Sequence, residues 1–211
     1  MSSSSNTTYF IIGGNRGIGF NLVKTLSAST DNVVIAFRGL PSLPKNKQLE
    51  DLKKSRDNIH TVQLDITDDE SVNKIADEIR KTPSFQGIDI LLQTLGSRIP
   101  TMSLAGSITG YVPISVSAYG QSKAALNFAI KELSFELKPE GFTVVAFHPG
   151  MVTTDMGQQG LGSFAKKGTD ISSLKVITPE ESASALVNVF SKISPEHNGK
   201  FMDYDGSEDT F

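Results

Sequence analysis

Residues 9–19, Tyr-Phe-Ile-Ile-Gly-Gly-Asn-Arg-Gly-Ile-Gly, decide the fold of this chain of 211 residues. The first four are apolar and favour a β-strand, and a cluster of glycines follows them at once. Beyond the glycines, Leu22, Val23 and Leu26 recur at the spacing of one helix face. The stretch therefore predicts a strand, a glycine turn and a helix, in that order.

At three positions of this turn, a glycine is required for a physical reason. Gly13 lets the chain reverse sharply, Gly17 lets the backbone approach a pyrophosphate, and Gly19 lets the helix pack close to the strand. The helix N-terminus then offers N–H donors and a positive dipole end. The spacing is G-x-x-x-G-x-G instead of the common G-x-G-x-x-G, and a glycine cluster without context is more often a plain loop. Between a strand and a helix, the cluster predicts a site for a dinucleotide cofactor.

A second feature is the pair Tyr119 and Lys123, near the start of a helix predicted at 117–138. Residues four apart lie on one face of a helix. An ammonium beside a phenol favours the phenolate and lowers a pKa that is otherwise about 10. The pair thus indicates a proton donor with a group that tunes it. Taken alone, the same spacing is more often a packed ring beside a solvated amine.

Strands and helices alternate along the rest of the chain. We predict strands at 8–13, 32–38, 59–65, 88–95, 142–148 and 200–204, and helices at about 17–28, 46–55, 68–81, 117–138 and 178–193. This order is typical of an α/β protein with a Rossmann-type doubly wound parallel sheet and helices on both faces. Residues 1–7 predict a disordered tail, and residues 8–211 a single cofactor-binding domain.

Composition excludes several classes of function. The chain has 20 basic and 23 acidic residues and a net charge of −3, so no basic surface for nucleic acid is expected. It has no cysteine, and its histidines, His60, His148 and His197, are too scattered to predict a metal site. No apolar run approaches the ~18 residues of a membrane span. A cytoplasmic protein is therefore expected.

Three motifs in register resemble the short-chain dehydrogenase/reductase family. They are the glycine motif at 13–19, the Tyr119/Lys123 pair and the segment His-Pro-Gly-Met-Val-Thr-Thr-Asp at 148–155. With Thr-Pro-Glu-Glu-Ser at 178–182 and Gly-Lys-Phe-Met-Asp-Tyr-Asp-Gly at 199–206, the chain is similar to the C-factor-like and sniffer-like carbonyl reductases and the fungal ketoreductases. The resemblance implies that residues 155–177, rich in Gly, Ser and Lys, form a mobile loop over the active site.

The resemblance also implies a serine that bonds the substrate carbonyl oxygen. Ser103, in Ser-Leu-Ala-Gly at 103–106, matches the family's S-x-x-G pattern and lies 16 residues before Tyr119. Ser107, 12 residues before Tyr119, is the competitor, and either serine alternatively forms a turn. The predicted catalytic residues are Ser103, Tyr119 and Lys123.

The cofactor is predicted from two cations. An enzyme that uses NAD usually has an acidic residue after the second strand, whereas the 2′-phosphate of NADP needs a cation. Here Arg38 follows that strand with no acid, and Arg16 lies in the glycine turn, so NADP is favoured over the alternative of two solvated arginines. Asp65 and Ile66 match the family's adenine contact, although Asp65 is alternatively a turn or helix cap.

Pro149, Val152 and Thr154 match the family's P-G-x-V-x-T element, which implies that the Val152 backbone fixes the nicotinamide carboxamide and that Thr154 helps to hold the cofactor. The complete predicted cofactor-binding set is Gly13, Asn15, Arg16, Gly17, Ile18, Gly19, Arg38, Asp65, Ile66, Tyr119, Lys123, Pro149, Val152 and Thr154.

One departure from the family lies in the middle of the chain. Gln93-Thr94-Leu95 replaces the family's Asn-Asn-Ala, and only Ser97 and Arg98 separate the fourth strand from the segment that matches the fifth. A parallel crossover takes about a dozen residues or more. The central segment is therefore expected to be abbreviated, without the helix that in the family carries a proton-relay Asn and contributes to a homodimer contact. The loss would uncover apolar surface and weaken that dimer.

Two functions follow from these expectations. The first is an NADPH-dependent oxidoreductase that reduces a ketone or aldehyde, with Tyr119 as the proton donor. The alternative is a catalytically impaired nucleotide-binding pseudoenzyme, or a splice or gene-model variant of a full-length reductase.

Overall fold

The computed structural model describes residues 6–38, 47–83, 85–94, 106–110, 117–155, 157–158 and 175–211, except for the side chains of Arg38 and Ser117. Contacts between α-carbons divide the chain into two compact units, Met1–Leu95 and Gly96–Phe211, and each is described by itself. The expectation of one domain over 8–211 stays a prediction. Of the predicted site residues, Ser103 and the side chain of Arg38 lie outside the described residues, as does the Ser97-Arg98 link.

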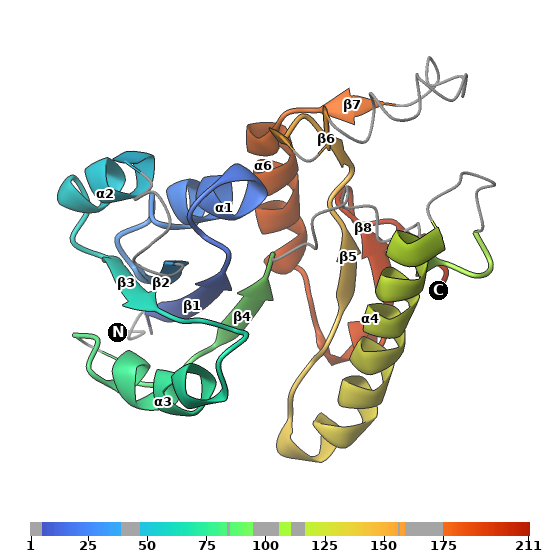
Figure 1. Ribbon diagram of the computed structural model, residues 1–211, viewed down its shortest axis with the longest axis horizontal. Coiled ribbons are helices and arrows are strands. Elements are labelled where there is room, and N and C mark those ends of the chain that lie inside the picture. The colour runs from blue at the N-terminus through green and yellow to red at the C-terminus, as the bar shows by residue number, and fades with distance from the viewer. Residues whose placement is uncertain are drawn as a thin grey trace. The chain divides into compact units, whose positions relative to one another are not determined.

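The first unit is built on a four-stranded parallel sheet (Figure 1). Its strands are β1 (Thr7–Ile12), β2 (Asn32–Arg38), β3 (Ile59–Gln63) and β4 (Ile90–Gln93), in the order β3-β2-β1-β4. β1 therefore lies between β2 and β4, and the glycine turn follows a strand that is paired along both edges. This arrangement confirms the predicted α/β fold with a Rossmann-type parallel sheet.

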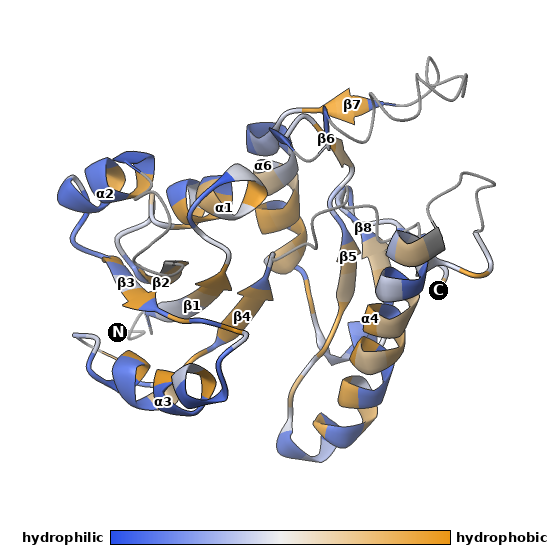
Figure 2. Ribbon diagram, in the orientation of Figure 1, coloured by the Kyte–Doolittle hydropathy of each residue, from blue (hydrophilic) through white to orange (hydrophobic). Residues whose placement is uncertain are grey.

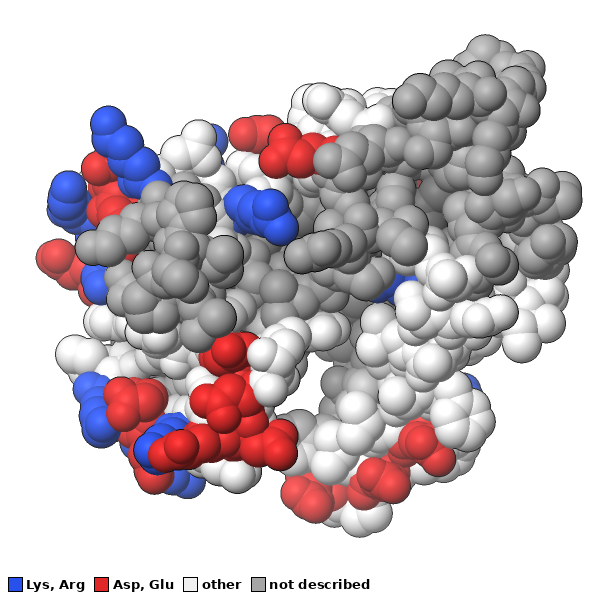
Figure 3. All heavy atoms as spheres, viewed as in Figure 1, with Lys and Arg blue, Asp and Glu red and all other residues white. Residues whose placement is uncertain are grey.

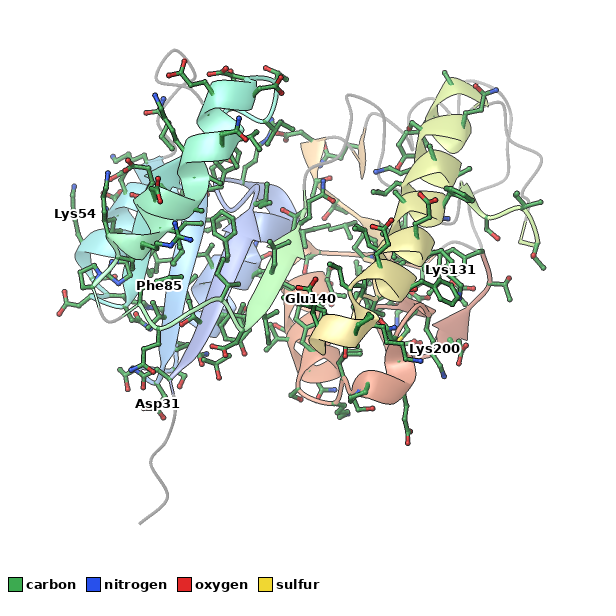
Figure 4. The ribbon with its side chains drawn as sticks, turned by 90° about the horizontal axis from the view of Figure 1, so that it is seen from below. Asp31, Lys54, Phe85, Lys131, Glu140 and Lys200 are labelled. Atoms are coloured by element: carbon green, nitrogen blue, oxygen red, sulfur yellow. The ribbon has the colours of Figure 1, made fainter. Side chains whose placement is uncertain are left out.

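Helices cover both faces of this sheet. Figure 1 shows α1 (Gly17–Leu26) and α2 (Lys47–Lys54) on one face and α3 (Asp69–Arg80) on the other. The α3 face is a cluster of apolar side chains with Phe10, Val33, Ile35 and Ile79 at its centre and Ile12, Val62, Ile75, Phe85 and Ile88 around them (Figure 4). Ile11, Val34 and Ala36 neighbour these core residues in sequence and therefore point to the opposite face of the sheet. They are fully buried too. Burial on both faces explains the continuous apolar runs of these strands.

Polar residues occupy the outer faces of the helices, as the hydropathy colouring of Figure 2 shows for α2 and α3. In Figure 3, Lys and Arg lie among Asp and Glu over both α2 and α3. Along α3 the charges pair within the helix, as Arg80 does with Asp77 and Lys81 with Glu78. Such exposed pairs contribute about 0–1 kcal/mol each, so these charges chiefly solvate the surface.

The described part of the second unit contains two small sheets and two long helices. β5 (Ala146–His148), β8 (Phe201–Asp203) and β9 (Glu208–Asp209) form one sheet in the order β5-β8-β9, and β6 (Met151–Val152) pairs with β7 (Val176–Ile177) in the other. β5 is parallel to β8, whereas β9 returns antiparallel to β8. The helices are α4 (Ser117–Glu136) and α6 (Pro179–Phe190), with short 3₁₀ turns at Lys138–Glu140 and Pro195–His197.

Side chains from both helices hold the β5-β8-β9 sheet. The Phe147 ring of β5 meets the Phe190 ring of α6 edge to face, with 5.2 Å between centroids. The Lys131 ammonium of α4 donates to the Gly199 carbonyl oxygen over 2.9 Å, and the Asn198 side-chain Nδ2 donates to the carbonyl oxygen of Ser134 on α4 over 2.7 Å. Figure 4 labels Lys131 on α4 and Lys200 at the start of β8. Residues 198–200 therefore tie α4 to the strand that follows.

Each predicted strand and helix has a counterpart in the structure: β2 has the predicted bounds, β1 is shifted by one residue, and the others are shorter. The strand predicted at 142–148 begins at Ala146 because the Val144 amide bonds the Asn198 side chain instead of a neighbouring strand. The loop predicted at 155–177 is wrong for both of its described ends. At the first, Gln158 N–H donates to the Thr154 carbonyl oxygen in a helical turn, and at the second, Val176–Ile177 forms strand β7, which pairs with β6. No described helix is long and apolar enough to span a membrane.

Candidate active site

In the first unit, the glycine turn has the geometry that the sequence predicts. Gly13 and Gly17 have φ values of 92° and 56°, in the left-handed region that favours glycine. A Cβ on Gly19 would lie 2.2 Å from the Gly13 carbonyl oxygen, so no side chain fits at that position. The first turn of α1 is thereby pressed against the end of β1.

The backbone amides at the start of α1 donate no hydrogen bond to a capping side chain. Its N-cap is Arg16, whose side chain is exposed and makes no cap hydrogen bond. The first four amides of a helix have no intrahelical partner, and they carry the positive end of the dipole. The first turn contains no acidic residue. Asn15 and Ile18 are half-buried beside it, and the arrangement fits an anion such as a pyrophosphate.

Thr94 supports this turn, and the sequence analysis gave it no role. Its amide and its hydroxyl both donate to the Ile12 carbonyl oxygen, over 2.9 and 2.8 Å. The hydroxyl oxygen also lies 2.6 Å from where a Gly19 Cβ would be. Thr94 replaces an Asn of the family pattern, and that departure was the signal that marked the position. It fixes the last residue of β1 before Gly13.

Asp65 forms a turn after β3. Its carboxylate accepts from the Thr67 hydroxyl over 2.7 Å and from the Thr67 amide over 2.9 Å, and these bonds hold the pKa of Asp65 below its usual range. The turn alternative is confirmed, whereas the helix cap of α3 is Asp68, which accepts from Glu70 N–H. Ile66 is 54% exposed beside it. The adenine contact of these two residues stays a prediction.

In the second unit, Tyr119 and Lys123 lie on one face of α4 and are both buried. Their exposed fractions are 3% and 7%, and the Lys123 Nζ is 5.6 Å from the centroid of the Tyr119 ring. Burial lowers the pKa of the Lys123 ammonium. The alternative of a solvated amine is wrong for this pair, because a surface lysine would be exposed. A buried cation beside a phenol is an arrangement suited to proton transfer.

The segment after the predicted serine contacts this helix. A Cβ on Gly106 would lie 2.5 Å from the backbone of both Lys123 and Ala124, so the segment meets α4 at the predicted catalytic lysine. Ser107 is 3% exposed, and its hydroxyl donates to the Thr210 carbonyl oxygen over 2.7 Å and accepts from Gly110 N–H over 2.8 Å. These bonds give Ser107 a structural role. Ser103 stays the predicted substrate-orienting serine.

The segment from Pro149 to Thr154 is held by β7 and α6. Gly150 turns with φ of 82°, and the Pro149 carbonyl oxygen accepts from the fully buried Ser182 hydroxyl over 2.7 Å. Val152 pairs with Ile177 in β6-β7. The Thr154 hydroxyl accepts from Gly157 N–H over 3.1 Å. From sequence, Ser182 was noted only as the last residue of the Thr-Pro-Glu-Glu-Ser match. The structure shows that its hydroxyl bonds the Pro149 carbonyl oxygen.

His148 lies at the end of β5, in register with Asp203 of β8. Burial lowers the pKa of His148, and the nearby carboxylates of Asp203 and Asp209 act against that shift. Its Nδ1 has no hydrogen-bond partner among the described residues. Across those residues, no group of acidic or histidine side chains could hold a metal ion.

Comparisons with known proteins found matches to two family models. A family model described as short chain dehydrogenase matches residues 7–109, and one described as enoyl-(acyl carrier protein) reductase matches residues 93–206. An uncharacterized oxidoreductase of Saccharomyces cerevisiae is 58% identical over 256 aligned positions that cover all of both chains.

Solved structures show the same fold. The carbonyl reductase Sniffer of Drosophila melanogaster matches with a TM-score of 0.81 and 25% identity, over 98% of this chain and 99% of that chain. A carbonyl reductase from chicken fatty liver, solved with NADPH bound, matches with a TM-score of 0.77 and 22% identity, over 97% and 98% of the two chains. The chain therefore belongs to the short-chain dehydrogenase/reductase family, whose members are oxidoreductases that use a nicotinamide cofactor.

Proposed function

We propose that this protein is an NADPH-dependent carbonyl reductase that converts a ketone or aldehyde into an alcohol. The observation that carries the proposal is the buried pair on α4, in which the Lys123 ammonium lies 5.6 Å from the Tyr119 ring. Burying a lysine ammonium costs free energy unless the charge is paired or hydrogen-bonded, and a buried group of this kind marks a candidate functional site. A phenolate at Tyr119 would be a partner for that charge.

In this mechanism Tyr119 transfers its hydroxyl proton to the carbonyl oxygen of the substrate. When bound, the nicotinamide supplies the hydride that adds to the carbonyl carbon, so that an alcohol forms and Tyr119 is left as a phenolate. Lys123 stabilises that phenolate by its positive charge and holds the nicotinamide ribose. Ser103 donates a hydrogen bond to the carbonyl oxygen and orients it. A positioned acid of this kind contributes about 10²–10⁴-fold to a rate.

The phosphate contacts of the cofactor are assigned to the first unit. The amides at the start of α1, with Gly13, Gly17 and Gly19, would bind the pyrophosphate, since Arg16 leaves that helix end without a side-chain cap. Arg16 and Arg38 would bind the 2′-phosphate of NADP. The NADPH named with the chicken liver reductase supports this choice.

The remaining cofactor contacts follow the family pattern. Asp65 and Ile66 would contact the adenine. Pro149, Val152 and Thr154 would hold the nicotinamide, on a segment that Ser182 and Ile177 fix in place. The cytoplasmic location, the homodimer and the single domain over 8–211 stay predictions.

The second candidate is a form that binds nucleotide but is catalytically impaired. The yeast relative aligns over 256 positions, which is 45 more than the 211 residues of this chain, although the alignment covers both chains completely. That difference supports an internal abbreviation such as the one predicted at Ser97-Arg98. The missing length includes a helix in the full family pattern, and its loss would weaken the support of α4 and the proton relay.

One experiment separates the two candidates. Purified protein is titrated with NADPH and NADH by fluorescence, and the complex is then supplied with a panel of ketones and aldehydes while absorbance of the reduced nicotinamide is followed. Binding of NADPH with turnover of any carbonyl supports the reductase. Binding of NADPH without turnover of any member of the panel supports the impaired form, and absence of binding contradicts both.

A further inference from the structure

Residues Thr210 and Phe211 are bound to the segment that follows the predicted substrate-orienting serine. The Ser107 hydroxyl donates to the Thr210 carbonyl oxygen over 2.7 Å, and the Thr109 amide donates to the Phe211 carbonyl oxygen over 3.2 Å. These bonds join positions about one hundred residues apart along the chain. The chain after β9 therefore acts as a strap across residues 107–110.

Phe211 is anchored by its ring as well as by its backbone. The ring stacks on Phe201 of β8, with centroids 5.4 Å apart and an interplanar angle of 30°. The Lys131 ammonium of α4 lies 5.7 Å from the centroid of the Phe211 ring. Phe201 is 1% exposed, so the strap rests on a core residue. Stacked aromatic pairs prefer a fixed geometry, and this anchor therefore sets where residues 210 and 211 lie.

The strapped segment in turn touches the predicted catalytic helix. Gly106 is buried, and a Cβ there would lie 2.5 Å from the backbone of Lys123 and Ala124. Ser107, next in the chain, holds both the strap and Gly110 N–H through one hydroxyl. A shift of residues 107–110 would therefore move the chain against α4 at Lys123.

We infer that Phe211 and Ser107 are positioning residues, which hold residues 106–110 against α4 at Lys123 and thereby fix Lys123 beside Tyr119. The catalytic consequence rests on the proposed carbonyl reductase function. The ordering of residues 106–110 does not, and it is measurable without any substrate. Positioning errors of a fraction of a hydrogen-bond length reduce turnover far more than they reduce cofactor binding.

The test compares Phe211→Ala and Ser107→Ala with the control Phe142→Ala. Phe142 is a phenylalanine of the same unit that is 54% exposed, so the control removes the same ring without touching the strap. Hydrogen exchange of the Thr109 and Gly110 amides is measured first, and we expect it to be about tenfold faster in both test variants and unchanged in the control. Ser107→Thr and Phe211→Tyr should restore protection.

Kinetics then measure the catalytic consequence. In Phe211→Ala, kcat for a carbonyl substrate should fall by about tenfold while the Kd for NADPH stays within about twofold, because the strap acts on geometry. Ser103→Ala should remove turnover without changing the exchange of residues 107–110.

Each outcome decides one claim. Unchanged exchange in Phe211→Ala overturns the strap, whether or not the protein turns over substrate. Faster exchange with unchanged kcat overturns its role in positioning. If the unmodified protein reduces no carbonyl, the proposed function fails, and the exchange result alone still supports or overturns the strap.

Discussion

The predicted sites of the two units are built from different parts of the chain. In Met1–Leu95 the site consists of backbone: the amides at the start of α1, the left-handed Gly13 and Gly17, and Gly19 with no room for a side chain. In Gly96–Phe211 it consists of two side chains, Tyr119 and Lys123, buried on one helix face. A backbone site is sensitive to added atoms, and a side-chain site is sensitive to removed ones. The predictions below use that contrast.

Removal of one oxygen from the second unit should have the largest effect. Tyr119→Phe keeps the buried ring and deletes the proton donor, so we expect turnover to fall by about 10²–10⁴-fold with the Kd for NADPH nearly unchanged. Steady-state kinetics and fluorescence titration measure the two quantities. Tyr204→Phe, in the same unit but beside Lys175, is the matched control. Undiminished turnover in Tyr119→Phe would refute the assigned donor.

Addition of one carbon to the first unit should break the backbone site. In Gly19→Ala the new Cβ would lie 2.2 Å from the Gly13 carbonyl oxygen, and the overpacking should cost about 1–3 kcal/mol or more in unfolding free energy and weaken NADPH binding. Gly141→Ala is a comparison in open space, where only the φ of 85° opposes the change. Denaturant melts and titrations measure both. Tight NADPH binding by Gly19→Ala would show that the turn is not the pyrophosphate site.

The cations test how much of the first unit's site depends on side chains. Arg38→Asp should erode or reverse a preference for NADPH over NADH, with a change in the ratio of the two Kd values of about tenfold or more, because it replaces a cation for the 2′-phosphate with an acid for the ribose hydroxyl. Arg16→Ala should weaken NADPH alone. Arg80→Ala, an exposed arginine of the same unit, is the control. Equal Kd values in the unmodified protein contradict the assignment.

The buried His148 should make the second unit sensitive to acid. Because burial lowers its folded pKa, the unfolded chain takes up the proton first, and the stability from the neutral ring is present above about pH 6.5 and lost as the pH falls toward the folded pKa. Asp203, whose pKa is raised by burial, acts in the opposite sense nearer its own range. The free energy of unfolding should therefore fall as the pH drops below about 6.5.

His148→Gln removes the titrating group and should flatten this slope, and His197→Gln, in the 3₁₀ turn Pro195–His197, is the control. A slope that is the same in the His148 variant and the unmodified protein would show that another group titrates.

The smallest effect is expected on the outer face of α4. Phe128 and Phe135, two helical turns apart, are 66% and 67% exposed. An apolar surface of this kind should bind a hydrophobic dye in the native state or associate with another molecule. Replacing both residues with Ser should reduce dye fluorescence or the apparent mass in light scattering. No change in either property would mean that Phe128 and Phe135 contribute neither to dye binding nor to association.

Much of the fold and part of each site could be predicted from sequence because their causes are local. The strand, turn and helix at residues 9–26 follow from adjacent residues, and Tyr119 and Lys123 share a face because helix periodicity requires it. The short strands β6, β7 and β9 were not predicted, since two residues carry no detectable alternation and only a distant partner makes them strands. The abbreviated link at Ser97-Arg98 stays a prediction.

By itself, the sequence determined which groups are available: glycines where backbone must approach an anion, a phenol and an ammonium one helical turn apart, and no cysteine. Only the tertiary structure decided their surroundings. It buried Lys123, placed the Thr94 hydroxyl on the end of β1, and brought Thr210 and Phe211 onto residues 107–109. The hydrogen bonds among these contacts join residues 82 to 103 positions apart. Burial and hydrogen bonding at such separation depend on packing of the whole unit, which no local pattern encodes.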